Sequence, residues 1–329
     1  MSLAPRAVLV HRVTEYEGLL ARHGTHGQAE FFLSSRGRSI EEVQRRHERN
    51  LRGLAEVAAA VPLSWRQARV ERADLDRFLF GPEDVVVVVG QDGLVANAAK
   101  YLDGQPVVGI DTDPGRNPGV LVRHRAADAG ALLRSAVASA GRTGVDALTM
   151  AEAVTDDGQR LLALNEIYLG PPTHQTARYT LAVEGGTGSM GPTGSAESAV
   201  SAEPTGVRGA TGATRSAPEP QASSGVLVGT GTGATGWLRS LWHERSSPLA
   251  LPAPTARRLA WFVREAWPSP TTGTTRVEGV LDAASSLHLT VESDRLVAFG
   301  DGMESDALDL AWGQTVRVGV AGTALRLVG

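Results

Sequence analysis

Five consecutive valines, Val85–Val89, are the feature that most restricts how this chain can fold. The run ends on glycine, in the segment Gly90-Gln91-Asp92-Gly93, and a helix-like run follows. A strand that is apolar on both faces has to be covered on both faces, which is typical of parallel sheets flanked by helices. The valine run therefore predicts a buried central strand of an α/β domain.

Strand and helix patterns alternate through the first 140 or so residues. From Ile40 to Val61, apolar residues recur at three- and four-residue steps, and Ser39 with Glu42 forms a capping-box pattern in front of them. Strands are also predicted at 6–10, 63–70 and 106–112, and helices at 94–102 and 126–141. Strands separated by helices imply a parallel sheet covered by helices.

The pattern changes after about residue 141. Two strand-like runs flank Asp156-Asp157-Gly158, a typical hairpin turn, and short apolar runs joined by turn residues continue from Ala260 to the end. We therefore expect an α/β N-terminal domain at 1–143, with a parallel sheet and helices, followed by an all-β C-terminal domain at 144–329.

One segment, 184–224, fits neither domain. It contains no Leu, Ile, Phe, Tyr or Trp, so it buries too little apolar surface to offset the entropy of ordering. We predict a disordered insertion within a loop. A recognition tail is the alternative, but the segment has no aromatic or basic cluster to support it.

Composition excludes several classes of function. The chain has no cysteine, which excludes disulfides, thiolate metal sites and cysteine nucleophiles. The net charge of −4 shows no basic bias toward nucleic acid or a membrane surface, and no apolar run approaches the length of a membrane span. We expect a cytoplasmic protein. His23 and His26 form an HxxH pair, but without a neighbouring acidic pattern we expect a polar loop and no metal site.

Two glycine-rich segments are candidates for ligand contact. No GxxxxGK[ST] phosphate loop is present, whereas Gly231–Gly236 matches GxGxxG after an apolar strand. Strand-rich sequence surrounds this match and no acidic residue follows about 20 positions on, so it is a weak dinucleotide fingerprint. The alternative interpretation is a loop whose glycines and threonines contact a polar ligand.

Asp92 is the acid held between glycines at the end of the valine strand. Ligands of open α/β sheets bind at the carboxyl ends of strands, and helix N-termini attract phosphate. A carboxylate beside phosphate is explained if it takes a proton from an attacking hydroxyl or holds Mg²⁺. The alternative is that Asp92 only forms a turn or caps the helix.

Five segments, in order, resemble motifs of the NAD kinase family. These are VVVVVGQDGLVANAAK, which resembles the GGDGT loop, then VVGIDTDPGRNPGVLV, LNEIYLG, SSGVLVGTGTGATGWLRSL and FGDGME. The N-terminal VTEYEGLLARHG and VQRRHERNLRGL look most like the mitochondrial-type NAD kinases. The resemblance covers nearly the whole chain except the insertion, and it implies an NAD kinase-like fold.

The resemblance also implies roles for individual residues. Asp92 would activate the 2′-hydroxyl of the adenosine ribose of NAD for attack on the γ-phosphate of ATP, with Mg²⁺ as the accompanying ion. The implied ATP and phosphate contacts are Gly90, Gly93, Asp111 and Thr112. The implied NAD contacts are Asn165, Glu166, Thr232, Thr235, Trp237 and Ser240.

Several of these residues also have a purely structural interpretation that involves no ligand. Asn165 and Glu166 would otherwise terminate a strand, and adjacent strand residues contact one ligand only at a strand end or bulge. Trp237 would otherwise pack in the core. Asp301, in the GDG turn, either approaches the site or only forms the turn.

The phosphate loop departs from the family at three positions. Gln91 stands where the family has a second glycine, Leu94 where it has threonine, and Asp111 where it has asparagine. We expect an active NAD kinase-like enzyme, with two alternatives: a nucleotide-binding sensor that has lost transfer, or a related kinase acting on a sugar or lipid hydroxyl. Because members of the resembled family are often oligomers, the resemblance implies a homo-oligomer, often a dimer.

Overall fold

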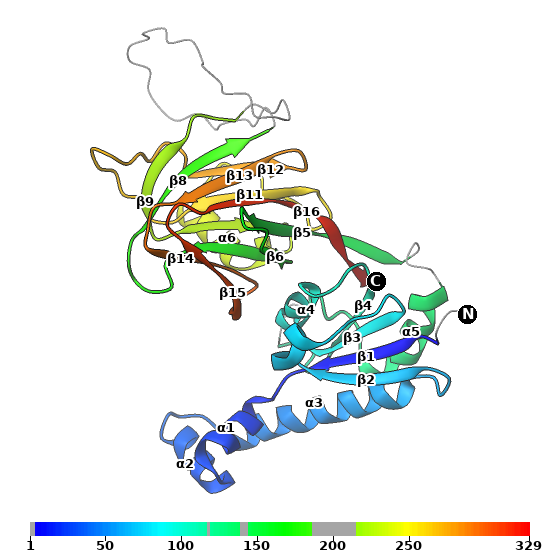
Figure 1. Ribbon diagram of the computed structural model, residues 1–329. Coiled ribbons are helices and arrows are strands. Elements are labelled where there is room, and N and C mark those ends of the chain that lie inside the picture. Colours follow the sequence, from blue (N-terminus) through cyan, green and yellow to red (C-terminus); the bar gives the residue numbers. More distant parts are fainter. Residues whose placement is uncertain (1–3, 117–118, 139–143, 186–214) are drawn as a thin grey trace. The chain divides into compact units, whose positions relative to one another are not determined.

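The computed structural model describes residues 4–116, 119–138, 144–185 and 215–329. The chain forms two compact units (Figure 1). Unit 1 comprises Met1–Ala147 together with Leu325–Gly329, and unit 2 comprises Leu148–Ala324. The sequence pattern predicted a single cut between residues 143 and 144, whereas the last residues of the chain return to unit 1.

Unit 1 is built on a parallel sheet. Its strands lie in the order β2 (Arg66–Glu71), β1 (Arg6–His11), β3 (Asp84–Gly90) and β4 (Pro106–Asp111). The end of β16 (Thr315–Val328) adds a further parallel pair to β4. All of Val85–Val89 are buried, which confirms the predicted central strand.

Helices cover both faces of this sheet. From α3 (Ile40–Ala60) and α5 (Ala129–Ala138), Leu54, Val57 and Leu133 join a core with the alternate valines of β3. The chain moves from β1 to β2 in one direction and from β3 through α4 (Asp92–Ala99) to β4 in the other. Right-handed crossovers in opposite directions place α3 and α4 on opposite faces, and they leave the topological switch between β1 and β3.

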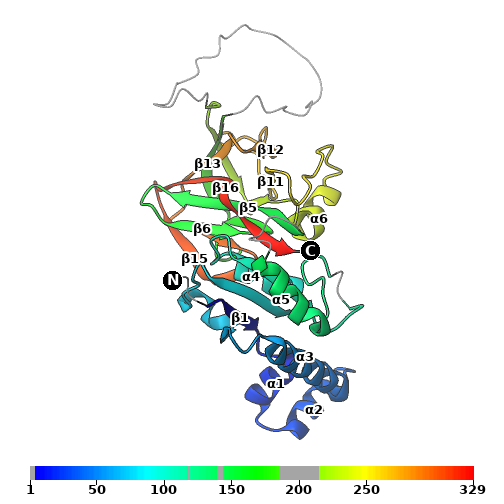
Figure 2. The ribbon, with the colours of Figure 1, turned by 90° about the vertical axis from the view of Figure 1, so that its right-hand side faces the viewer.

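Two helices that the sequence analysis did not predict, α1 (Glu15–His23) and α2 (His26–Ser34), lie against the amino-terminal half of α3 (Figure 2). Thr14 and Glu17 start α1 with a capping box, whose bonds are 3.3 Å from Glu17 N to Thr14 Oγ1 and 2.8 Å from Thr14 N to Glu17 Oε2. The segment Thr14-Glu15-Tyr16-Glu17 is therefore the capping pattern from which this helix could have been predicted. The shared apolar cluster consists of Leu19, Ala29, Leu33, Ile40 and Val43.

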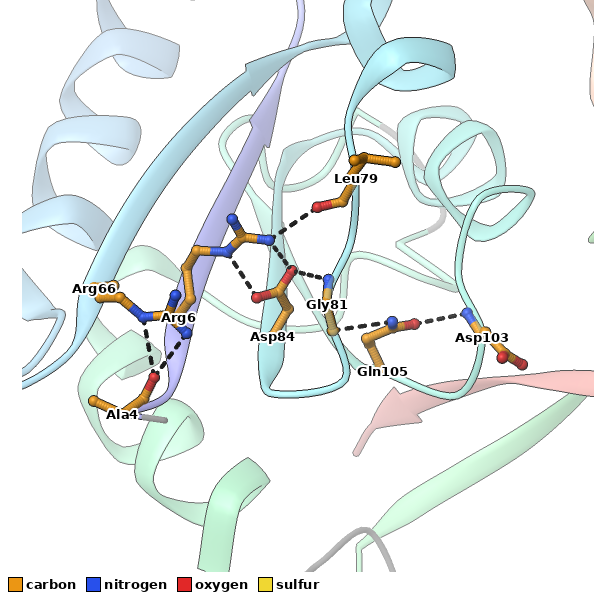
Figure 3. Close-up of polar contacts among 8 residues, drawn as sticks. All are labelled: Ala4, Arg6, Arg66, Leu79, Gly81, Asp84, Asp103 and Gln105. Atoms are coloured by element: carbon orange, nitrogen blue, oxygen red, sulfur yellow. Dashed lines mark hydrogen bonds and ion pairs between the residues drawn. The ribbon is translucent and has the colours of Figure 1, made fainter. Parts of the chain in front are cut away.

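A polar network fixes the amino ends of β1 and β3 (Figure 3). Arg6 donates from Nε to Asp84 Oδ1 at 2.7 Å and from NH2 to Asp84 Oδ2 at 2.6 Å, and Gly81 N donates to the same Oδ2 at 2.8 Å. The Asp84 side chain is only 1% exposed. This pair, of which the carboxylate is buried, holds the two strands together at the edge opposite to Gly90.

Unit 2 is built from two β-sheets, which confirms the predicted β-rich C-terminal domain. A six-stranded antiparallel sheet has the order β12 (Glu278–Asp282), β11 (Arg258–Val263), β10 (Val226–Gly229), β7 (Glu166–Gly170), β14 (Arg295–Gly300) and β15 (Met303–Ala311). In the second sheet, β16 pairs with β13 (Ser286–Val291) and with β5 (Val145–Thr155), and β13 pairs with β8 (Ala177–Glu184). One apolar core takes side chains from both sheets.

The remaining elements complete unit 2. The predicted hairpin at Asp156–Gly158 joins β5 to β6 (Arg160–Ala163), and Gly158 has a φ of +88°. The short helix α6 (Trp237–Glu244) packs on β10 and β11. None of the described helices is long and apolar enough to cross a membrane.

The predicted disordered insertion, 184–224, is only partly described. Residues 186–214 lie outside the described residues. At its carboxyl end the prediction of disorder is wrong, because Glu219–Ser223 forms strand β9 and pairs with β8. Backbone pairing supplies the order there, and the buried Gln221 adds a side-chain bond of 2.8 Å to the carbonyl of Arg276.

Candidate functional site

The predicted phosphate-loop residues of unit 1 meet at the carboxyl edge of its sheet. Gly90 pairs in register with Asp111, so the turn after β3 and the turn after β4 are neighbours. Gly90 has a φ of +155°, which favours glycine. An added Cβ at Gly93 would meet no atom within 4 Å, so the space beside it is open. The structure thus brings Gly90, Asp92, Gly93, Asp111 and Thr112 together.

Asp92 is the first residue of α4 and is not its N-cap, a position that Gln91 occupies. Its Oδ1 accepts hydrogen bonds from the backbone N–H groups of Leu121 at 2.8 Å and Val122 at 2.9 Å. Its Oδ2 accepts one from Val120 N at 3.0 Å. The carboxylate is therefore fixed by the backbone of 120–122, and Oδ2 has the greater remaining capacity to accept a proton or a ligand.

Gly109 explains how the 120–122 segment comes so close to the sheet. A Cβ added to this residue of β4 would lie 2.1 Å from the carbonyl oxygen of Leu121. Only a glycine permits that approach, and the approach presents three consecutive N–H groups to Asp92. No local sequence pattern indicates this role for Gly109 or for the segment.

Two departures from the GGDGT pattern have a local explanation. Gln91 has φ −127° and ψ 160°, an extended conformation open to any residue, so glutamine causes no backbone strain at this position. Leu94 is 2% exposed and belongs to the interior of unit 1. Where the resembled motif has threonine, this chain has a leucine that packs in the core.

Asp111 and Thr112 shape the turn after β4. Asp111 Oδ1 accepts from the backbone N–H of Asp113 at 2.8 Å, which closes an Asx-type turn. Thr112 Oγ1 accepts from Asn50 Nδ2 on α3 at 3.2 Å. The side chain of Asp111 therefore stabilises its own loop.

A second group of predicted residues meets in unit 2. Asn165 precedes β7 and Glu166 begins it, so the pair lies at a strand end. Asp301, in the turn between β14 and β15 with φ +55°, accepts from Leu164 N at 2.8 Å and from Asn165 N at 2.7 Å. Asp301 therefore forms the turn and also braces the Asn-Glu segment.

Glu166 is the most perturbed acid of this group. Burial raises its pKa from 4.5 to about 8, and the negative charge of Asp301 adds to the rise. A carboxyl group with such a pKa is largely protonated at neutral pH. It can then donate one hydrogen bond as well as accept others.

The loop Gly229–Gly236 packs directly against the Asn-Glu segment. Thr230 N donates to the carbonyl of Asn165 at 2.9 Å, and an added Cβ at Gly233 would lie 2.2 Å from that same oxygen. The loop enters α6 from an antiparallel strand, so it is not the turn of a βαβ unit. Within the described residues, the buried Oγ1 of Thr232 has no hydrogen-bond partner.

Trp237 and Ser240 lie in the first turn of α6, and Thr235 lies in the short 3-10 turn before it. The ring of Trp237 stacks on Tyr168 at 5.6 Å between centroids, and the Arg264 guanidinium lies 5.4 Å from it. Trp237 is thus packed against the protein on at least one face. Thr235 bonds to the carbonyl of Thr232 at 2.9 Å, and Ser240 is exposed.

The histidine pair lies on helices and not in the expected polar loop. His23 ends α1 with its ring 4.4 Å from that of Phe32, and His26 begins α2 with Nδ1 2.9 Å from the Tyr16 hydroxyl. Among the described residues, no group of three His, Asp or Glu side chains is arranged to hold a metal ion.

The structure adds residues that the sequence analysis missed. Arg49 and Asn50 of α3 reach the turn after β4, where Arg49 NH2 is 2.6 Å from Asp113 Oδ1. No motif signals this contact, because 64 residues separate the two partners.

Known proteins match this chain in structure but not in sequence. No protein-family model matches the chain, and no curated protein matches it in sequence. Its structure is similar to the crystal structure of yeast NADH kinase complexed with NADH, with a TM-score of 0.55 and 12% sequence identity, over 99% of this chain and 84% of that one. The chain has the NADH kinase fold. At this identity the similarity shows the fold alone.

Proposed function

We propose that this chain is an NAD kinase-like phosphotransferase that moves the γ-phosphate of ATP to the adenosine-ribose 2′-hydroxyl of NAD. The observation that carries the proposal is Asp92, held at the carboxyl end of a buried parallel strand in a chain with the fold of an NADH kinase. The resemblance of the surrounding motifs supports the same reaction.

In this proposal, Asp92 accepts the proton of the attacking hydroxyl. A bond forms between the ribose oxygen and the γ-phosphorus, the bond from that phosphorus to the bridging oxygen of the β-phosphate breaks, and ADP leaves. The N–H groups of Val120, Leu121 and Val122 keep the carboxylate from rotating, so its Oδ2 presents a fixed acceptor. Gly93 leaves room for phosphate beside the start of α4, and Gly90 supplies the positive φ of the turn.

Mg²⁺ fits this arrangement. Magnesium is commonly bound through one or two carboxylates plus substrate phosphates, so a larger cluster of acids is not required. Asp92 Oδ2, with a single backbone donor, would be the oxygen that holds it, as the alternative to accepting the proton. The ion would offset the negative charge of the phosphates.

For NAD we propose the Asn165–Glu166 segment and the loop that packs on it, including Thr232, Thr235, Trp237 and Ser240. The unpartnered hydroxyl of Thr232 is a buried polar atom suited to a ligand. The raised pKa of Glu166 makes it a donor to a ribose oxygen near neutral pH. Cytoplasmic location and a homodimer remain expectations drawn from the sequence.

The test is NADP formation from NAD, ATP and Mg²⁺, followed with an NADP-specific dehydrogenase. Asp92→Asn should lower the rate by roughly 10²-fold or more, the scale for loss of a positioned base. Asp103→Asn, at an exposed aspartate of the same unit, is the matched control and should keep the rate. Unchanged activity of Asp92→Asn would refute the role of Asp92.

A nucleotide sensor without transfer is the second candidate. Two observations favour it. Three backbone N–H groups already occupy much of the hydrogen-bonding capacity of the Asp92 carboxylate. The buried Leu94 also lacks the hydroxyl of the threonine in the GGDGT motif. NAD binding without turnover would support it. ADP formation with a sugar or lipid alcohol, and none with NAD, would instead indicate a related kinase with another acceptor.

A further inference from the structure

The amino-terminal half of α3 extends past the carboxyl edge of the unit 1 sheet. The carboxyl-terminal half packs on the strands through Leu54 and Val57, whereas Ile40 and Val43 pack on α1 and α2. Figures 1 and 2 both show α1 and α2 beside this outer half. The outer half of α3 is therefore beside the edge where the Gly90–Gly93 turn lies.

Gly53 marks the point where α3 passes that edge. An added Cβ at Gly53 would lie 2.9 Å from Thr112 Cγ2, so the helix is in close contact with the turn after β4. One turn earlier, Asn50 donates to Thr112 Oγ1 at 3.2 Å. These two contacts fix the position of α3 along its axis, and its rotation about that axis, relative to the turn.

Because α3 is held in this position, the side chain of Arg49 reaches the turn after β4. Its NH2 is 2.6 Å from Asp113 Oδ1, and its side chain is 42% exposed. Two other arginines of α3 are directed elsewhere: Arg46 pairs with Glu15 of α1 at 3.3 Å, and Arg52 contacts its own helix at the carbonyl of Glu48. A guanidinium has five N–H donors, so the bond to Asp113 leaves most of them available.

We propose that Arg49 binds the polyphosphate of the phosphoryl donor, and that Asn50 and Gly53 position it. The inference rests on the proposed function for the identity of the ligand. Asp111, whose partner in register is Gly90, belongs to the same turn as Asp113, so Arg49 adds positive charge beside the Gly90–Gly93 loop. Arginine is suited to bidentate recognition of phosphate. It would supply contacts that the exchange of threonine for Leu94 has removed.

The test measures binding of ATP and of inorganic tripolyphosphate by calorimetry, without relying on turnover. Arg49→Ala should weaken both by roughly 10- to 100-fold, as expected for loss of a charge-assisted contact, and NAD binding should not change. Arg52→Ala, which removes the same charge one turn along the helix, should leave both affinities unchanged. Loss for ATP alone would assign the contact to the nucleoside and would overturn the proposal.

Asp113→Asn separates phosphate binding from a structural ion pair. It removes the partner of Arg49 but keeps the guanidinium, so phosphate affinity should be retained or increased. An equal loss in Arg49→Ala and Asp113→Asn would show that the pair only maintains the loop, and it would overturn the proposal. Urea midpoints of both variants check that they are folded.

The outcome does not depend on catalysis. If wild type binds ATP through Arg49 but makes no NADP, the kinase proposal fails and the Arg49 proposal stands. If wild type makes NADP and Arg49→Ala keeps both its KM for ATP and its affinity, the Arg49 proposal fails alone. If wild type binds neither ATP nor tripolyphosphate, the Arg49 proposal fails.

Discussion

Replacing Glu166 with glutamine is expected to stabilise the protein at pH 8 and to have little effect near pH 4.5. Burial, and then the charge of Asp301, raise the pKa of Glu166 from 4.5 to about 8 in the folded protein. In the unfolded chain the carboxyl group ionises above pH 4.5, but in the folded protein it stays protonated until about pH 8. The folded state is therefore penalised progressively as the pH rises between these values.

The magnitude follows from that interval. The difference between 4.5 and about 8 is about 3.5 pH units, and each corresponds to about 1.4 kcal/mol, so the full penalty is about 5 kcal/mol. Some of it is relieved because the side chain keeps partial exposure, so we expect about 3 kcal/mol at pH 8. Glutamine has nearly the same shape and does not ionise, so the substitution removes the penalty.

Urea unfolding at pH 5 and pH 8 measures the effect. The decisive quantity is the stability gain of Glu166→Gln over wild type at pH 8 minus the gain at pH 5, because changes in packing cancel between the two. Glu304→Gln, at an exposed glutamate of the same unit, is the control and should show no such difference. Equal gains at the two pH values, or a loss at pH 8, would refute the assignment of a protonated Glu166.

Three further outcomes test the description of the two units. Asp84→Ala leaves the guanidinium of Arg6 without its buried partner and should cost about 3 kcal/mol of stability in urea unfolding. Gly109→Ala places a Cβ 2.1 Å from the Leu121 carbonyl. It should cost about 1–3 kcal/mol and increase hydrogen exchange at residues 120–122. Thr232→Val replaces an unpartnered buried hydroxyl with a methyl group, so stability should stay within about 1 kcal/mol while NAD binding weakens by about 10-fold.

Much of the fold could be predicted because local patterns and tertiary packing agree. The valine run, the periodicity of α3 and the Asp156–Gly158 turn each specify one element with little ambiguity. Ser39 does accept from Glu42 N at 3.3 Å, as the capping pattern indicated. Strand β9 escaped prediction because its order comes from pairing with β8, which its own Gly-, Ser- and Pro-rich neighbourhood does not reveal.

The candidate site could be predicted only as far as its motifs extend. A carboxylate at the end of β3 follows from the sequence, but its three N–H donors come from 28–30 residues further on. The pKa of Glu166 depends on burial and on Asp301, which lies on another hairpin. Such properties arise from tertiary packing, and no local pattern encodes them.

The return of the chain to unit 1 has a consequence for synthesis on the ribosome. Strand β4 pairs at Pro106 with Arg326, which is translated 220 residues later. At about 5–20 residues per second, that edge of the sheet waits on the order of 10–40 s for its partner. During that interval the Pro106–Val107 end of β4 lacks its partner strand, and an unpaired strand edge is a template for pairing with another chain. A chain truncated before Leu325 should keep this edge permanently open and should aggregate faster than the full chain in a light-scattering assay.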